Sequence, residues 1–465
     1  MVSKGGRYGR WLTDKKVPAQ KPLPNTIPVE SEFKTLPKMQ TNPLAFTSPA
    51  ASAKNPASGV FHVPFVRPMM PPYELLHEEF EKIVCSGQLT KGPNVQKFEQ
   101  AIAQRLGVRH AVAVSSCTVG LMLVYKSLGI AAGSCRDNRG RADCRVAGME
   151  QRSRLNGALS VDLTQPMGEV IMPSYTFLAG PAAVVWNNLR PVFIEVDPAT
   201  TNVLPQTVAA AITPHTVAIS ACHNFGNPCD VPALEAIAAE HGLPLIIDAA
   251  HGFGASSHGK PVGSGGTAQI FSLSPTKLLV AGEGGIVATN CDCLAHFVRM
   301  GREYGNDGSY DALFSGVNGR MPELSAALGL ASLTILDSVV VRRDQIATLY
   351  RQELSQVPGI GFVETSPGSQ SSHKDFSITI DPAQFGISRD SLRREMADRG
   401  IETRAYYDPP CHLQKAFAHF YDPMRPLPVT ELLSARSLSL PMGAHVDEAV
   451  VDDICKTIAH VQQTL

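Results

Sequence analysis

Short apolar runs and helical patterns alternate along most of the chain. The apolar runs are nearly continuous, which is typical of strands buried on both faces of a sheet. Between several of them, apolar residues recur at the three- and four-residue spacing of a helix. The strand-like runs are 110–116, 169–174, 191–196, 217–222, 244–249, 268–274 and 284–289, and the helical segments are 118–128, 177–188, 205–212 and 231–241. This alternation predicts an α/β fold with a mostly parallel central sheet sandwiched by helices.

The chain on either side of this region has a different pattern. Two helical patterns, 73–85 and 94–105, precede the first strand, and a long helix is expected from 321 to about 355. The remaining residues predict a smaller α+β domain. Its expected parts are a strand at 375–380, a helix at 388–399, a turn at 406–412 (YYDPPCH) and a final helix at 447–463.

Two segments lack a clear apolar period. Residues 1–60 are rich in Pro, Ser, Lys and Ala, which indicates a disordered N-terminal extension. Residues 133–167 contain six arginines and several glycines, which indicates a surface insertion. We therefore predict a large domain at 61–335, which carries this insertion, and a small C-terminal domain at 336–465.

Composition narrows the class of protein. The 465 residues are 44% hydrophobic and 18% charged, with a formal net charge of -1, so charge gives no argument for binding nucleic acid or an anionic membrane. No uninterrupted apolar run has the length expected of a membrane span. The ten cysteines show neither a disulfide framework nor a convincing zinc-site spacing, so we expect no metal site, and reduced thiols in the cytoplasm.

Two charged residues stand where predicted strands end. Lys277 (FSLSPTK) follows one strand and precedes the glycine-rich AGEGG, where its amine could form an imine with an aldehyde cofactor. Most single lysines are ordinary surface residues. Asp248 (PLIIDAAH) ends a strongly apolar strand, and its carboxylate could pair with a protonated ring nitrogen or simply cap the next helix.

Two further strand ends carry polar or aromatic residues. In SSCTVG, a turn of small residues opens a helix whose free N–H groups suit a phosphate, and Thr118 adds a hydroxyl. In PSYTF, Tyr175 or Phe177 could stack on a cofactor ring, although core packing is the commoner use of such residues.

Taken together, these motifs resemble the DegT/DnrJ/EryC1/StrS family of sugar aminotransferases, which use pyridoxal 5'-phosphate (PLP) and have the aspartate-aminotransferase fold, PLP fold type I. The resemblance covers about residues 62–465 outside the insertion. The motifs occur in order: SGQLTKGPNVQKFE, EVIMPSYTF, PVFIEVDP, HNFGNPCDV, PLIIDAAHGFGA, FSLSPTK, GEGGIVAT, GVNGRMPELSAAL, YYDPPCHLQ and LSLPM.

The resemblance implies a cofactor site. Lys277 would hold the cofactor as an imine, Asp248 would pair with the pyridine nitrogen, and His251 would lie beside the ring hydroxyl. The remaining cofactor residues would be the phosphate ligands Ser272, Cys117 and Thr118, the stacking residue Phe177, and Asn318, which would reach the phosphate of a neighbouring subunit. Cys117 departs from the family, which usually has Gly or Ala there, but we expect a small thiol to leave PLP binding intact.

The same resemblance implies a reaction. An amino group would move by a ping-pong mechanism from L-glutamate to a keto-sugar, expected to be nucleotide-linked. Shared active sites would make the chain a homodimer. Tyr407, His412 and Arg320 are candidates for contacts with the substrate.

Three other functions are compatible with parts of this pattern. An aminocyclitol enzyme acting on a keto-inositol would share the same motifs, and a PLP-binding regulatory protein without catalysis is a further possibility. Related sugar dehydratases carry histidine in place of the reactive lysine, so Lys277 argues against that activity.

Overall fold

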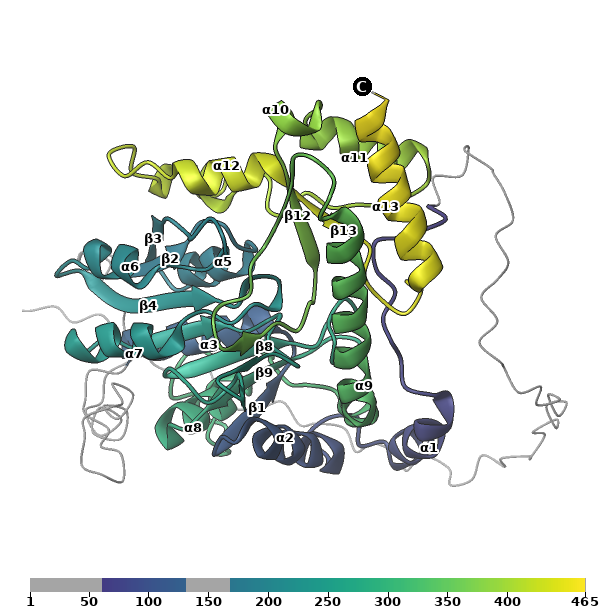
Figure 1. Ribbon diagram of the computed structural model, residues 1–465. Helices are drawn as coiled ribbons and strands as arrows, with labels where there is room; N and C mark the ends of the chain where they lie inside the picture. The colour runs from purple at the N-terminus through teal and green to yellow at the C-terminus, as the bar shows by residue number, and fades with distance from the viewer. Residues whose placement is uncertain (1–60, 131–167, 465) are drawn as a thin grey trace, which may run out of the picture. The chain divides into compact units, whose positions relative to one another are not determined.

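The computed structural model describes residues 61–130 and 168–464 (Figure 1). The predicted extension at 1–60 and the predicted insertion at 133–167 lie outside the described residues, so those two predictions stay untested.

A seven-stranded sheet forms the centre of the described chain (Figure 1). In spatial order its strands are β1 (His110–Val114), β9 (Gly285–Thr289), β8 (Ala268–Ser272), β5 (Leu245–Asp248), β4 (Thr216–Cys222), β2 (Glu169–Pro173) and β3 (Arg190–Ile194). The pairs β2–β3, β2–β4, β4–β5 and β5–β8 are parallel, whereas β9 runs antiparallel to both neighbours. The predicted α/β class with a mostly parallel sheet is therefore confirmed.

Helices cover both faces of this sheet. Successive side chains of a strand point to opposite faces. In β1, Val112 and Val114 pack with one set of helices, and Ala111 and Ala113 with the other. The first face carries α3 (Cys117–Ile130), α5 (Ala179–Trp186) and α8 (Asp292–Gly301); the second carries α2 (Pro93–Leu106), α6 (Pro205–Ala211), α7 (Val231–Glu240) and the first half of α9 (Glu323–Leu354). Burial on both sides explains the continuous apolar runs.

A second, antiparallel sheet lies in the C-terminal part. Its strands, in order, are β10 (Ile360–Phe362), β12 (Phe376–Ile380) and β13 (Ser437–Leu440), and α11 (Arg389–Asp398), α13 (Glu448–Gln463) and the second half of α9 pack against it. The smaller elements are α1 (His77–Ser86), α10 (Pro382–Phe385), α12 (Pro428–Arg436), the short strands β6 (Ser256–Ser257), β7 (Lys260–Pro261) and β11 (Ser369–Gln370), and 3₁₀ turns at Tyr73–Leu75, Asn224–Gly226, Cys411–Leu413 and Ala418–Phe420.

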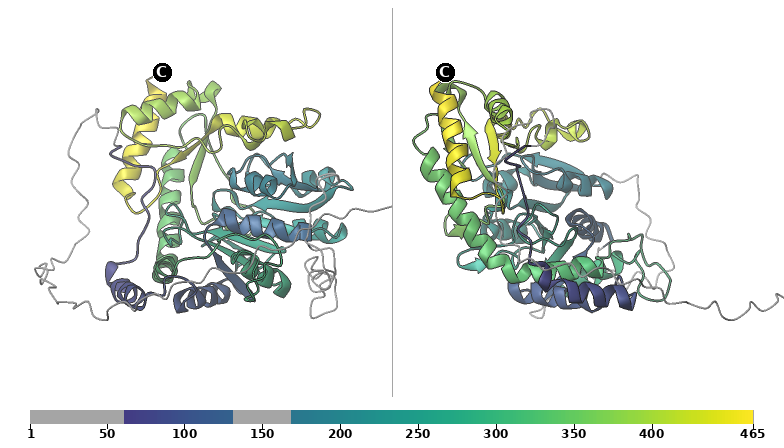
Figure 2. Two further views of the ribbon diagram at one scale, coloured as in Figure 1. Left: turned by 180° about the vertical axis from the view of Figure 1, so that it is seen from behind. Right: turned by 90° about the vertical axis from the view of Figure 1, so that its right-hand side faces the viewer.

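Helix α9 connects the two sheets. It has 32 residues and contacts both α2 and α13. Figure 2 shows this helix in green, between the purple-blue α2 and the yellow α13. By length and composition α9 could also cross a membrane, with a mean hydropathy of 1.9 over 18 residues. Its contacts with α2 and α13 give those apolar side chains partners within the protein. The expected domain boundary at 335/336 falls inside this continuous helix and stays a prediction.

Glu323, the first residue of α9, fixes the start of α2. Its fully buried carboxylate accepts hydrogen bonds from the backbone N–H groups of Gly92 (2.9 Å), Asn94 (2.8 Å) and Val95 (3.1 Å). These N–H groups have no partner within α2, because the first turn of a helix lacks acceptors. A Cβ on Gly92 would lie 2.7 Å from the Glu323 carboxyl carbon, so a side chain there would displace the carboxylate from its three donors.

We expect Glu323→Ala to lower the free energy of unfolding by about 3 kcal/mol or more, since several buried N–H donors lose their acceptor. Urea unfolding followed by circular dichroism measures this loss. Glu395→Ala removes a half-exposed carboxylate that pairs with Arg399 and should cost much less. Equal losses in the two variants would contradict the capping role.

Candidate functional site

The predicted site lies at the carboxyl edge of the parallel strands, centred on Asp248 at the end of β5. Asp248 is only 7% exposed, and burial raises the pKa of its carboxyl group. One oxygen accepts a hydrogen bond from Ala250 N at 2.9 Å. Within residues 61–130 and 168–464 the carboxylate forms no ion pair. A buried carboxylate in this position is stabilised by a cationic ligand group, and a protonated pyridine nitrogen would supply one.

Lys277 follows β8, the strand next to β5. Burial and, after it, the positive charge of Lys374 lower the pKa of its amine to about 8, and Asp375, Cys117 and Asp248 limit that shift. A lysine with this pKa is partly neutral near physiological pH, which is the form that attacks a carbonyl carbon. Lys277 therefore has the electrostatic setting of a reactive amine.

His251 supplies a direct test of whether PLP fits. Its side chain is 8% exposed, and among the described residues its Nδ1 atom has no hydrogen-bond partner. Burial, followed by the positive charges of Lys277 and Lys374, holds its pKa well below the usual range, so the imidazole is neutral. A neutral ring with a free nitrogen beside Lys277 can bond a ligand hydroxyl. The site therefore fits the predicted cofactor.

The predicted phosphate turn lies at the start of α3. The Ser116 hydroxyl accepts a hydrogen bond from Val119 N at 3.2 Å and caps the helix. A Cβ on Gly285 would lie 2.6 Å from the Cys117 nitrogen, so only a glycine in β9 lets this turn approach the sheet. The Cys117 thiol lies 3.6 Å from the carbonyl oxygen of Ile270 and 4.0 Å from Asp248.

Two further phosphate candidates lie close to this turn. Thr118 is half-buried in the first turn of α3, and Ser272 is buried at the end of β8. The Ser272 hydroxyl is 3.4 Å from both the hydroxyl and the backbone nitrogen of Ser274. The neighbouring strands and α3 thus bring Asp248, Lys277, Ser272 and Cys117 to one edge of the sheet.

The remaining cofactor candidates lie on the surface of the single chain. Phe177, between β2 and α5, is 52% exposed, and Asn318 is also exposed. The substrate candidate Arg320 pairs with Glu303 at 3.0 Å and lies over the ring of Tyr304. Their roles stay predictions.

The other two substrate candidates are buried and have partners within the chain. Tyr407 stacks on Phe225 with ring centres 5.7 Å apart, and His412 Nδ1 lies 2.6 Å from the Ser174 hydroxyl. These contacts give both side chains a structural use, and their predicted substrate contact stays untested. Tyr175 is fully buried in a core cluster and donates to the backbone oxygen of Tyr406, as expected of a packing residue.

Sequence reasoning missed a buried ion pair next to the site. Lys374 and Asp375 stand just before β12, and the Lys374 ammonium lies 2.8 and 2.9 Å from the two Asp375 oxygens. A Lys-Asp dipeptide before a strand gave no functional signal in the sequence, and only the fold shows that the two charges act on the pKa of Lys277. No group of three or more His, Cys, Asp or Glu side chains within 61–130 and 168–464 is arranged to hold a metal ion.

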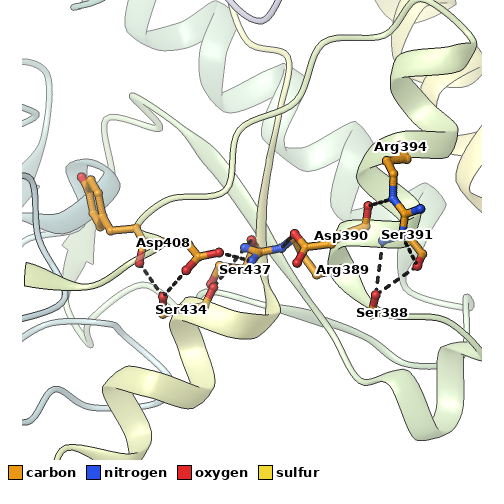
Figure 3. Close-up of polar contacts among 9 residues, drawn as sticks. Ser388, Arg389, Asp390, Ser391, Arg394, Asp408, Ser434 and Ser437 are labelled. Carbon is orange, nitrogen blue, oxygen red and sulfur yellow. Dashed lines mark hydrogen bonds and ion pairs between the residues drawn. The ribbon is translucent and has the colours of Figure 1, made fainter. Parts of the chain in front are cut away.

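A second missed residue, Arg389, holds the 406–412 turn (Figure 3). Its buried guanidinium donates to the backbone oxygens of Ser434 (3.0 Å) and Ser437 (2.9 Å) and to the Asp408 carboxylate (2.5 Å). The Ser434 hydroxyl donates in turn to the backbone oxygen of Tyr407 at 2.7 Å. Arg389 therefore joins α11, α12, β13 and the turn that carries Tyr407.

We expect Cys117 to be unreactive, because burial and the charge of Asp248 raise its pKa well above the usual range. Each pH unit of such a rise lowers the thiolate fraction about tenfold, so iodoacetamide should label exposed Cys85 at least roughly 100-fold faster. Peptide mass spectrometry of the folded protein measures both rates, and denatured protein is the control. Equal labelling of the two cysteines in folded protein would contradict this expectation.

Arg389→Met should lower the free energy of unfolding by about 3 kcal/mol, because Asp408 and two buried carbonyl oxygens lose their partner. Arg389→Lys keeps the charge without the planar fork and should recover only part of that loss. Denaturant titration compares both with Arg399→Met, which removes a half-exposed pair with Glu395. A loss from Arg389→Met no larger than that of Arg399→Met would show that the network is dispensable.

Comparison with known proteins places the chain in a family. The profile of the DegT/DnrJ/EryC1/StrS aminotransferase family matches residues 73–135 and 155–459. The erythromycin biosynthesis sensory transduction protein EryC1 of Saccharopolyspora erythraea is 34% identical over 378 residues, which cover 81% of this chain and 92% of that protein. The dTDP-3-amino-3,4,6-trideoxy-alpha-D-glucose transaminase of Streptomyces venezuelae is 32% identical over 400 residues, covering 84% and 95%.

A solved structure gives the same result. The crystal structure of DesI in the presence of its TDP-sugar product superposes with a TM-score of 0.75 at 34% identity, covering 87% of this chain and 94% of that one. The fold is that of PLP fold-type I aminotransferases. The profile match and these identities show that the chain is an aminotransferase and belongs to the DegT/DnrJ/EryC1/StrS family.

Proposed function

We propose that this chain transfers an amino group from L-glutamate to a nucleotide-linked keto-sugar, using PLP in a ping-pong reaction. The observation that carries the proposal is the arrangement around Lys277. A half-buried lysine whose pKa is lowered to about 8 shares one sheet edge with the buried Asp248 carboxylate and with His251, whose Nδ1 has no partner in the described part of the chain. Strongly shifted groups of this kind gather at catalytic sites.

Each residue has a proposed role. When bound, PLP would supply an aldehyde that captures amines and a ring that withdraws electrons. Lys277 would bind the aldehyde carbon and later carry a proton to and from the reacting carbon as a general base. Asp248 would keep the ring nitrogen protonated, and His251 would orient the ring hydroxyl.

The phosphate and the ring face would be held by other segments. The N–H groups at the start of α3 point out of the helix, so Cys117 and Thr118 would bind the phosphate together with Ser272. Phe177 would cover the ring. Asn318 is exposed in the single chain, which suits a contact with the phosphate in a neighbouring subunit.

The acceptor class is inferred from the relatives. A transaminase of a dTDP-linked amino sugar and DesI with its TDP-sugar product are both similar along most of the chain. Arg320, Tyr407 and His412 are the proposed substrate residues. The aminocyclitol alternative differs in acceptor only, so a panel of nucleotide-linked keto-sugars and keto-inositols distinguishes the two.

A regulatory protein is the second candidate, because one similar protein is named a sensory transduction protein. The charged neighbours of Lys277 argue for the enzyme. We further propose a cytoplasmic homodimer with shared sites and a division into large and small domains near 335. The ten cysteines show no disulfide-framework spacing along the sequence, which supports a reducing compartment.

The absorbance spectrum of the purified protein, before and after L-glutamate, tests the proposal. We expect a visible band from the lysine-bound cofactor that glutamate removes as the amino group transfers. Lys277→Ala should slow that change by about 100-fold or more, whereas Lys456→Ala, on an exposed face, should not. A protein that stays colourless with added PLP would rule out the enzyme and favour a scaffold that has lost its cofactor. A visible band that glutamate leaves unchanged would favour the PLP-binding regulatory alternative.

A further inference from the structure

We propose that the buried Lys374–Asp375 ion pair is a positioning element for the reactive lysine. In this arrangement Lys374 places a second ammonium beside Lys277, and Asp375 partly neutralises it. The inference rests on the proposed role of Lys277, although its test requires no amino transfer.

The pair is held away from solvent in a fixed place. The side chains of Lys374 and Asp375 are only 5% and 2% exposed, and both Asp375 oxygens bond the same ammonium. Removing two charges from water raises the free energy of the folded state unless a well-aligned ion pair compensates for it. The Lys374 ammonium also lies 5.8 Å from the ring centre of Tyr406, which favours a cation at that point.

The backbone before the pair is unusual and firmly held. His373 adopts φ 46°, a left-handed conformation that is uncommon for residues other than glycine. Arg343, buried in the middle of α9, donates from Nη1 to the backbone oxygens of His373 (2.9 Å) and Lys374 (2.8 Å). Support of this kind maintains a conformation that the sequence alone does not favour.

The same segment contacts the predicted cofactor site directly. The Ser372 hydroxyl donates to the backbone oxygen of His251 at 2.7 Å, and Lys374 N donates to the backbone oxygen of Phe225 at 3.1 Å. A Cβ on Gly226 would lie 2.0 Å from the Ser372 hydroxyl, so the fit leaves no room for a side chain. The ion pair is thereby attached to the site that holds Lys277 and His251.

The charged and titratable groups around Lys277 come from several elements. Cys117 starts α3 and Asp248 ends β5, while Lys374 and Asp375 precede β12. His251, neutral through burial, lies beyond β5. Of these groups, only Lys374 is a cation, and its charge favours a neutral Lys277 amine. Asp375 acts on Lys277 in the opposite sense.

Lys374 and Asp375 shift the pKa of Lys277 in opposite directions, which gives a specific test. Lys374→Met removes the neighbouring cation, so the pKa of Lys277 should rise by about one pH unit. Asp375→Asn leaves Lys374 without its counter-charge, so the pKa of Lys277 should fall by about the same amount. In the double variant the two effects should largely cancel, and the midpoint should return toward that of the unmodified protein.

The measurement is competitive acetylation of the full-length, cofactor-free protein between pH 6 and 11, with Lys277 read by peptide mass spectrometry. The unmodified protein should give a midpoint near about 8. Lys456→Met and Asp452→Asn disrupt an exposed ion pair and should leave that midpoint unchanged. Circular dichroism verifies that each variant is folded.

Unchanged midpoints in folded Lys374→Met and Asp375→Asn would overturn the inference, as would shifts of the same sign in both. If Asp375→Asn does not fold, Lys374→Met and the double variant decide between the outcomes, because the first must raise the midpoint and the second must raise it less. A protein with the expected shifts that fails to react with glutamate would instead refute the proposed amino transfer and leave the ion pair's effect intact.

Discussion

The buried carboxylate of Asp248 is the constraint on which the site depends. It ends β5 in the middle of the sheet, and in the described chain it has a backbone N–H partner but no cation within ion-pair distance. Such a group raises the free energy of the folded chain until a positively charged ligand binds. The folded chain thus accepts a loss of stability at a position that suits a cationic ring. Nearby, the neutral His251 has a ring nitrogen, Nδ1, that has no hydrogen-bond partner among the described residues.

The order of the strands brings other candidate functional side chains to the same edge as Asp248. Because β5 and β8 are parallel neighbours, the segments after them emerge at the same edge, and Lys277 follows one while His251 follows the other. Gly285 in β9 lets the start of α3 approach from the side, so the helix N-terminus faces the same space. The segments after β5 and β8 and the start of α3 therefore meet at one edge because of the path of the backbone.

The sequence predicted the central sheet and this edge well, since continuous apolar runs and polar strand ends are local signals. It did not predict Arg389 or Lys374, because the partners of each are fixed by tertiary contacts. Arg389 meets Ser434 and Ser437 far along the chain, and Lys374 lies about 100 positions after Lys277 in the sequence, so its effect on the pKa of Lys277 arises only in the folded chain. Nor could it show that Tyr407 and His412 are buried, since a polar turn rich in proline reads as surface.

Helix α9 connects the stability of the chain to the electrostatics of the site. Its first residue, Glu323, caps α2 on the central sheet, and Arg343, ~30 Å further along the axis at 1.5 Å per residue, holds the backbone oxygens of His373 and Lys374. The Arg343 Nε atom is buried without a partner among the described residues, which lowers the net stabilisation that the guanidinium provides. Its remaining contacts fix the segment that brings a second ammonium toward Lys277. The same helix therefore fixes the start of α2 through Glu323 and the segment that carries the Lys374 charge through Arg343.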